Sequence, residues 1–285
     1  MRSSILSVVV TATTFASTAA AAPTERDAAA EPRAERPHAE DVDPAHAVVL
    51  AEAQAGLGTR SFDYVDRVTP GLRSYGVSAA PRVGIAGEVY PLAPFRSDLP
   101  SGLGLALGYS ATPYLQSEGQ DGAALETRWT SLDAALRMRV PLARGSMVTG
   151  TLGYGGVDFG FAADPTQLRE RATGTGVLPE VRYRFVRAGA DGRVAVWRLA
   201  VLAGLDYLFV TSTGAVEARF PRSSAGGIEA RLGVAYPIVN HVELRTALRY
   251  QRFFHDLAPE PGDANVAGGA LDELGYWQTS LALAF

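Results

Sequence analysis

The last ten residues of the chain, 276–285, constrain the fold more than any other stretch. Side chains of two kinds alternate there: one set is Trp277, Thr279, Leu281, Leu283 and Phe285, and the other is Tyr276, Gln278, Ser280, Ala282 and Ala284. A strict period of two places alternate side chains on opposite faces of a strand. The sequence therefore predicts a strand with one strongly apolar face, which ends on an aromatic residue at the last position of the chain.

The same alternation recurs from residue 46 onward, in segments of about ten residues that polar stretches separate. Counting these segments predicts ten antiparallel strands, with eight and twelve as the alternatives. Short connections are expected near 91–101, 141–146, 187–192 and 237–240, and long ones near 63–80, 114–128, 162–176, 211–226 and 255–272. An even number of strands puts both ends of the strand region at the same end of the sheet.

Alternating apolar residues that close on a terminal Phe resemble the C-terminal strand of bacterial outer-membrane β-barrel proteins, small porin-like barrels among them. The resemblance covers roughly residues 46–285 as a pattern and is specific only in the strand that ends at Phe285. It implies an all-β, transmembrane, up-and-down antiparallel barrel in the outer membrane of a Gram-negative bacterium, in contact with outer-membrane lipid. It also implies that the barrel-assembly machinery reads the terminal strand.

The N-terminus predicts secretion through the Sec route. Arg2, an apolar run over 5–16 and small residues over 17–22 follow the layout of a signal peptide, with cleavage expected after Ala21. The apolar run is shorter than the roughly 20 residues that a membrane-spanning helix needs. Residues 22–45 are rich in Ala, Pro, Glu, Asp and Arg and lack aromatic residues, so we expect a disordered periplasmic leader before a barrel over 46–285.

Charged residues occupy alternate positions of several expected strands. An Arg that faced hydrocarbon at mid-depth would cost about 2–4 kcal/mol, so these residues are expected to face the lumen. The predicted lumen-lining residues are Glu88, Asp133, Arg137, Arg139, Glu180, Arg182, Arg184, Arg198, Asp206, Glu229, Arg231, Glu243, Arg245 and Arg249. Their signs nearly balance, which favours a lumen filled by paired side chains over a narrow pore with a slight preference for anions.

Aromatic residues are expected at the two membrane interfaces, where an apolar ring and a polar tip are both satisfied. Tyr109, Tyr154, Tyr207, Tyr250 and Trp277 are predicted at the end with long loops. Tyr90, Tyr183, Trp197, Tyr236 and Phe285 are predicted at the end with short turns.

One turn gives a testable register. A three-residue connection over 238–240 would place Glu229 opposite Arg249 and Gly233 opposite Arg245. A shift of one residue on each strand would place Arg231 opposite Arg249, and like charges directly opposite each other are unfavourable. The first register is therefore the predicted one.

The expected function is structural, or that of a narrow passive pore for small solutes or ions. The alternative is a surface adhesin or receptor that acts through the long loops. No cofactor, metal site or catalytic residue is predicted, since the chain has no Cys and its four His form no cluster. A net charge of −4 without an outward basic stripe disfavours nucleic-acid binding.

An omptin-like protease is a less favoured alternative. Omptins carry an Asp and a His at the extracellular rim, separated by one intervening residue, and both face an Asp pair across the rim. In this chain His255 and Asp256 are adjacent and in the opposite order, so a strand would point them to opposite faces, and Asp121 is the only candidate for the other wall. The sequence therefore predicts that the protein is not an enzyme.

Overall fold

The computed structural model describes residues 44–95, 99–118, 124–142, 145–161 and 179–285, and all of them lie in one compact unit. The predicted signal peptide and nearly all of the predicted leader fall outside the described residues, and the expected long connection over 162–176 does too. No helix within the described ranges is long and apolar enough to cross a membrane.

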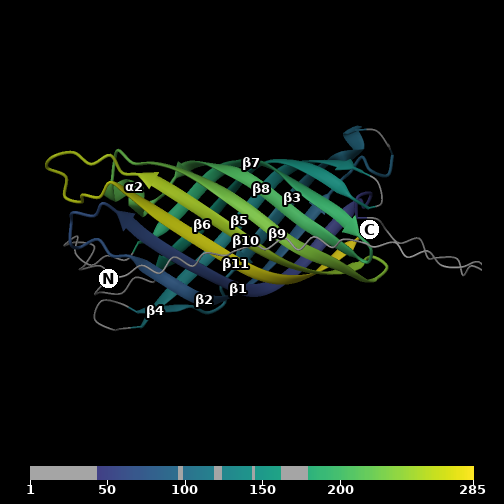
Figure 1. The fold of residues 1–285 in the computed structure, drawn as a ribbon, viewed down its shortest axis with the longest axis horizontal. Helices are drawn as coiled ribbons and strands as arrows, with labels where there is room; N and C mark the ends of the chain where they lie inside the picture. Colours follow the sequence, from purple (N-terminus) through teal and green to yellow (C-terminus); the bar gives the residue numbers. More distant parts are fainter. Residues whose placement is uncertain (1–43, 96–98, 119–123, 143–144, 162–178) are drawn as a thin grey trace, which may run out of the picture. The chain divides into compact units, whose positions relative to one another are not determined.

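Ten strands form a closed antiparallel barrel (Figure 1). Each strand pairs with the next in the chain, and the ring closes where β1 pairs with β11 and where β3 pairs with β5. The barrel strands are β1 (Val49–Val65), β2 (Tyr75–Val89), β3 (Leu103–Ala111), β5 (Ala124–Pro141), β6 (Met147–Phe161), β7 (Val181–Val196), β8 (Leu199–Ser212), β9 (Ser224–Val239), β10 (Val242–Asp256) and β11 (Gly269–Ala284). The predicted all-β, up-and-down barrel of ten strands is therefore confirmed.

Three short elements of the described chain lie outside the ring. Strand β4 (Gln116–Glu118) extends β5 as a small hairpin, η1 (Leu99–Gly102) precedes β3, and α2 (Ala215–Arg219) lies between β8 and β9.

The barrel has two unlike ends, which we call the turn end and the loop end. The turn end carries Val49, Phe285, the short β5–β6, β7–β8 and β9–β10 turns and the longer β2–β3 connection with η1. There the Val48 amide donates to the Phe285 carbonyl at 2.5 Å. The loop end carries the longer connections and α2, on the side opposite the C-terminus in Figure 1. Both ends of the described chain section thus meet at one mouth, as an even strand number requires.

The outer surface of the barrel is a broad apolar belt. Leu132 of β5 is 60 % exposed, Leu205 of β8 is 62 % exposed and Leu248 of β10 is 59 % exposed. Soluble proteins rarely expose a continuous apolar surface of this extent, whereas transmembrane barrels carry an outward apolar band. Toward the loop end the belt stops at the outward charged pair Arg252 and Glu273, whose side chains are about 40 % exposed (43 % and 41 %).

Strand β7 corrects one expected turn. The short connection predicted near 187–192 is wrong, because β7 runs without interruption from Val181 to Val196 and the chain reverses at Trp197 and Arg198. A Cβ on Gly189 would lie 2.0 Å from Oδ1 of Asp206. The small residues of this stretch therefore make room for neighbouring side chains and do not form a turn.

The register between β9 and β10 also differs from the predicted one. Arg231 lies directly opposite Arg249, so the prediction that placed Glu229 opposite Arg249 is wrong. The turn holds two residues, Asn240 and His241, with His241 in the left-handed region at φ 71°, and the register shifts once between Val242 and Glu243.

Carboxylates on β8 and on β9 itself explain why this register is tolerated. Arg231 Nη2 lies 2.6 Å from Oδ2 of Asp206, and Arg249 Nη2 lies 2.7 Å from Oε2 of Glu229. Carboxylates thus neutralise both guanidiniums, and the rule against like charges across a strand pair does not decide the register.

The seam between β1 and β11 yields a prediction about folding. A Cβ on Gly56 would lie 2.0 Å from the Trp277 carbonyl oxygen, whereas one on Gly150 would meet nothing within 4 Å. We expect Gly56→Ala to lower the free energy of unfolding by about 1–3 kcal/mol, the usual cost of overpacking. Gly150→Ala, the matched control, should stay within about 0.5 kcal/mol of the parent in urea unfolding of the refolded barrel. Equal stability of the two variants would contradict a close contact at this seam.

Candidate functional site

A network of ion pairs fills the middle of the lumen, with Arg187 of β7 at its centre. Its guanidinium lies 3.0 Å from Asp133 of β5 and 2.8 Å from Glu229 of β9, and it also bonds Asp206 of β8. The side chains of Asp206 and Glu229 are 0 % exposed. Buried charges are tolerated only when they are paired. The single Arg187 side chain meets this requirement and connects β7 to β5, β8 and β9.

Further arginines extend the network around the ring. Arg231 lies 2.8 Å from Asp191, and Arg137 lies 3.0 Å from Asp191 and 3.5 Å from Glu88. Arg249 lies 2.7 Å from Glu229. Charged side chains from opposite walls therefore meet across the lumen.

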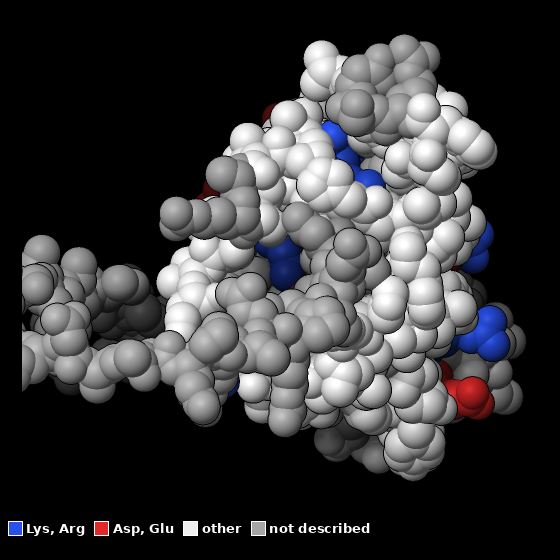
Figure 2. Space-filling model, turned by 90° about the vertical axis from the view of Figure 1, so that its right-hand side faces the viewer, with Lys and Arg blue, Asp and Glu red and all other residues white. Residues whose placement is uncertain are grey.

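The turn half of the lumen holds a second set of pairs. Arg193 donates to both carboxylate oxygens of Glu243 at 3.1 and 2.5 Å. Arg245 then links Glu243 at 2.9 Å to Glu52 at 3.1 Å. A cavity of about 210 Å³ lies among these groups and Arg137. Seen from the turn end, arginine side chains lie at the floor of a recess near the middle of the face (Figure 2).

The first described residues of the chain fold against the turn-end mouth. Arg139 donates to the carbonyl oxygens of Pro44 at 2.9 Å and Ala47 at 2.8 Å. Its guanidinium lies 3.7 Å from the centre of the Tyr90 ring. The segment 44–47 thereby narrows the mouth on one side.

An apolar core fills the loop half of the lumen. Tyr183 and Phe253 stack with their ring centres 3.9 Å apart, and Trp129 packs edge-on against Phe159 at 5.7 Å. The fully buried members of this core include Phe62, Trp129, Phe159, Tyr183, Phe185, Leu208, Phe253 and Leu274. Val216 and Phe220 at α2 cover the core from the loop side. The interior of this half is therefore packed like the core of a soluble protein.

One ion pair lies inside that apolar core. Arg60 and Asp272 bond through two parallel contacts of 2.9 and 2.8 Å, with both side chains 0 % exposed. The Tyr183 hydroxyl donates to Asp272 at 2.9 Å and lies 3.0 Å from Nε2 of His255. These bonds satisfy both charges, and they join β1, β7, β10 and β11 at one level.

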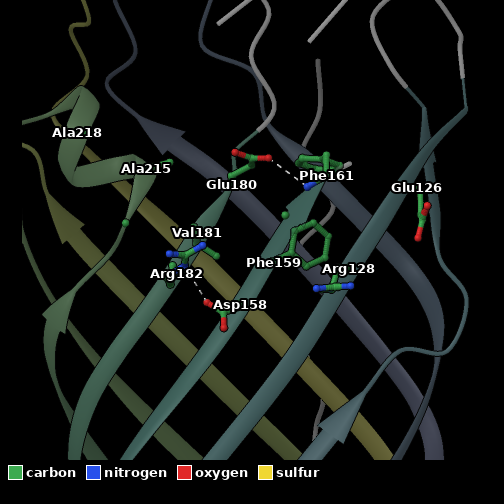
Figure 3. A pocket seen from close by; sticks show the side chains of 12 residues that line it. Glu126, Arg128, Asp158, Phe159, Phe161, Glu180, Val181, Arg182, Ala215 and Ala218 are labelled. Atoms are coloured by element: carbon green, nitrogen blue, oxygen red, sulfur yellow. Dashed lines mark hydrogen bonds and ion pairs between the residues drawn. The ribbon is translucent and has the colours of Figure 1, made fainter. Parts of the chain in front are cut away.

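A hollow of about 630 Å³ lies at the loop-end rim, beside α2 and the ends of β5, β6 and β7. Figure 3 shows Arg182 turned toward Asp158, at 3.3 Å, and Glu180 turned toward the Phe161 amide. The remaining charged residues of the lining, Glu126 and Arg128, are exposed on β5. The hollow therefore offers both signs of charge above the edge of the core at Phe159 and Phe161.

An exposed ion pair joins two of the loops at this end. Arg222, after α2, bonds Asp263 in the connection between β10 and β11, and Arg222 also donates to the Ala258 carbonyl at 3.2 Å. The hydrogen bond from Arg222 holds the pKa of Asp263 below its usual range. The pair is solvent-exposed, so it orients the loops more than it stabilises the fold.

The comparisons with known proteins agree with this architecture. No protein-family model matches the chain, and no curated protein matches it. Among solved structures, the outer membrane protease OmpT from Escherichia coli superposes with a TM-score of 0.51 at 9 % identity, over 83 % of this chain and 96 % of that chain. The β-domain of the Bordetella autotransporter BrkA matches with a TM-score of 0.40 at 12 % identity, over 84 % of this chain and 100 % of that one. The chain folds as a bacterial outer-membrane β-barrel.

The apolar belt and the barrel fold are those of a protein of the bacterial outer membrane. Barrels of this membrane have short periplasmic turns and longer extracellular loops. Three of the four connections at the turn end are short, and the rim hollow lies at the opposite end.

Most of the predicted lumen residues lie inside this outer-membrane barrel. Those on the inner face are Glu88, Asp133, Arg137, Arg139, Asp206, Glu229, Arg231, Glu243, Arg245 and Arg249. They form the central network and the pairs of the turn half.

Four predicted lumen residues lie elsewhere, so these predictions are wrong. Arg182 and Arg184 point outward from β7 and pair with Asp158 of β6 at 3.3 and 3.0 Å. Glu180 precedes β7 and accepts from the Phe161 amide, and Arg198 is exposed in the β7–β8 turn. The inner face of β7 carries Tyr183 and Arg187 instead, and the prediction had placed Tyr183 on the outer face.

Most of the aromatic residues predicted at the membrane interfaces are exposed on the outer surface, and two are buried inside the barrel. Those exposed on the outer surface are Tyr109, Tyr154, Tyr207, Tyr236, Tyr250, Trp277 and Phe285, and Trp197 is 91 % exposed in the β7–β8 turn. Tyr90 and Tyr183 were expected at the membrane interface, and this is wrong, since they are 1 % and 0 % exposed inside the barrel. Both rings contact buried charged groups, Arg139 and Asp272, which a strand-by-strand pattern does not show.

Sequence analysis missed several inner charges: Arg60, Arg82, Arg187, Asp191, Arg193 and Asp272. Strict alternation puts Arg187 and Asp191 on the same face as Tyr183, so continuing the strand past 187 would have excluded an outward Tyr183, because two charges would then face hydrocarbon. The omptin comparison is also resolved in part: His255 faces the lumen while Asp256 is exposed, and Asp121 lies outside the described residues.

The central network yields a prediction about stability. Glu229→Gln removes the carboxylate that holds Arg187 and Arg249 and leaves buried cations without enough counter-charge. We expect the free energy of unfolding to fall by about 3–5 kcal/mol, the usual cost of breaking a buried pair. Glu273→Gln, which removes the exposed partner of Arg252 at 3.7 Å, should cost less than about 1 kcal/mol. Urea unfolding in one detergent measures both, and a loss of similar size in the two variants would contradict the structural role of the network.

Proposed function

We propose that this barrel is a structural, non-conducting protein of the outer membrane that presents its loop end to the outside. The observation that carries the proposal is the apolar core of the loop half, where rings from β1, β5, β6, β7 and β10 pack against one another inside the lumen. A hydrated path for ions needs polar lining along its whole length. In the loop half the core is packed, and its charged groups, Arg60 and Asp272, are 0 % exposed and bonded to each other.

The charge network supports the same proposal. Arg187 contacts three carboxylates, and Glu229 is shared with Arg249 and Arg231. Conduction requires binding that is weak enough for an ion to leave. Charges that already saturate one another act as internal cross-links between strands and not as a selectivity filter.

The rim hollow favours a second function, recognition of a ligand at the cell surface. Its lining places Arg128, Arg182, Glu126 and Glu180 beside the Phe159 and Phe161 segment, on a rigid strand framework (Figure 3). Loops and rims carried by rigid scaffolds are common binding surfaces. Mixed charge beside aromatic groups suits a zwitterionic or peptide-like ligand better than a simple ion.

Catalysis has less support than either function. OmpT is a protease, and at 9 % identity the likeness extends to the fold alone. In this chain the His255 imidazole contacts the buried Tyr183 hydroxyl, and the side chain is 6 % exposed. A general base must reach substrate, and this ring is enclosed by the core.

Partners follow from the same proposal. The outward belt would contact outer-membrane lipid, and the barrel-assembly machinery would engage the terminal strand. Phe285 is 57 % exposed on the outer surface next to the β1–β11 seam, where its amide donates to the Val49 carbonyl at 2.9 Å.

The decisive measurement is conductance of the refolded full chain in a planar bilayer. We expect a barrel that inserts, as judged by protease resistance of its strands in the same lipid, and passes no discrete current steps. Arg249→Ala, which removes a network arginine and leaves the apolar core intact, should be equally silent. Steps of the parent protein whose anion preference weakens in Arg249→Ala would show instead that the network lines an open pore.

A further inference from the structure

Arg82 of β2 is a buried cation with an unusual set of partners. Its side chain points into the lumen and the residue is 6 % exposed. Nη2 donates to the hydroxyls of Ser110 at 2.6 Å and Ser131 at 3.2 Å, and both acceptors are neutral. Nη1 is buried and has no hydrogen-bond acceptor among the described residues.

The other inner arginines differ from Arg82 in this respect. Arg60, Arg137, Arg187, Arg193, Arg231, Arg245 and Arg249 each contact at least one carboxylate, and Arg139 binds two backbone carbonyls. No carboxylate of the described chain lies within ion-pair distance of Arg82. A charge removed from water without a counter-charge is destabilising, so a further anionic partner is expected.

The position is built to hold a guanidinium. Arg82 lies 4.5 Å from the Trp129 ring centre and 5.0 Å from that of Tyr276. A Cβ on Gly58 would lie 2.8 Å from both Arg82 Cδ and Trp129, so a glycine is needed to admit the stacked pair. Ring faces offset part of the cost of burying a cation, but they do not supply an acceptor for Nη1.

A small cavity adjoins this guanidinium. Its volume is about 30 Å³, and its polar lining consists of Gln54, Arg82, Ser110, Arg249, Tyr276 and Gln278. The lining contains two arginines and no carboxylate. The carboxylates that pair with Arg249, Glu229 at 2.7 Å and Asp133 at 3.6 Å, are outside it. The space admits a particle the size of one or two waters, and it adjoins the cavity of about 190 Å³ that Glu88 and Asp133 line.

We propose that this cavity binds a chloride ion, which serves as the counter-ion of Arg82. The chloride accepts from Nη1 of Arg82 and from the neighbouring amide and hydroxyl donors that line the cavity. It neutralises Arg82, for which the described residues supply no carboxylate. The site is structural, and it makes barrel stability depend on a specific small anion.

The test compares unfolding of the refolded full chain in detergent with sodium chloride and with sodium gluconate at equal ionic strength, since gluconate is too large for the cavity. A single site on the folded state predicts that, above saturation, each tenfold rise in chloride raises the folding equilibrium constant tenfold. Arg198→Gln removes an exposed turn arginine and should keep the full chloride effect. Equal stability of the parent protein in the two salts would overturn the proposal.

A variant with its own counter-charge sharpens the test. Gln54 of β1 lines the cavity and lies opposite Gly84 of β2. Gly84 is two residues after Arg82 and therefore on the same inner face of β2. Gln54→Glu should supply the missing carboxylate, so its stability in gluconate should match that of the parent in chloride and should no longer respond to chloride. A variant that kept the whole chloride effect would place the ion elsewhere and refute the site.

Bromide locates the ion independently of stability. Crystals of the full chain grown in bromide should show an anomalous peak within hydrogen-bond distance of Arg82 Nη1. That peak should be absent from Gln54→Glu crystals. Bromide found only at other positions would refute the site at Arg82.

Discussion

Pairing of charges across the lumen is the constraint on which this barrel depends. Strand alternation leaves every inner position enclosed by a ring of backbone, and the chain places many of its arginines and carboxylates there. None of these groups could face the hydrocarbon, and none could remain buried alone. Arg187 shows how the chain meets both requirements, since its guanidinium joins carboxylates of β5, β8 and β9. The ion pairs thus link strands that the backbone ladder does not bring into contact.

The lumen is filled by two different means, and the division follows the membrane belt. Inside the belt and toward the turn end, ion pairs fill the interior. Toward the loop end, where outward charges such as Arg252 and Glu273 mark the end of the belt, the interior is an aromatic core around the Arg60–Asp272 pair. This part of the barrel is packed like the core of a soluble protein. It provides a rigid base for the rim hollow and for the loops that Arg222 and Asp263 join.

The sequence was sufficient for the architecture because the period of two is a local signal that each strand repeats. It was sufficient for the inner face of β5, β9 and β10, where charges alternate with large apolar groups. The prediction failed on β7 because the small residues near Gly189 resemble a turn. These residues are small because the Asp206 side chain of the neighbouring strand β8 occupies the space beside them, which the sequence of β7 alone does not show. It failed on the β9–β10 register because the partners that separate Arg231 from Arg249 lie on β8 and elsewhere on β9. Arg60 and Asp272 are 212 residues apart, and no spacing rule connects them.

The size of the barrel explains why ion pairing in the lumen and blockage of the lumen occur together. Eight strands enclose just enough space for side chains, so ten strands leave an excess that must be filled. In the loop half aromatic rings occupy it. In the middle and the turn half, long arginines reach across it and leave cavities of about 210 and 190 Å³ among their carboxylates. A solute in transit would have to separate ion pairs that the fold itself requires, and it would then meet the apolar core. The interactions that allow these strands to carry charge therefore also oppose conduction through the barrel.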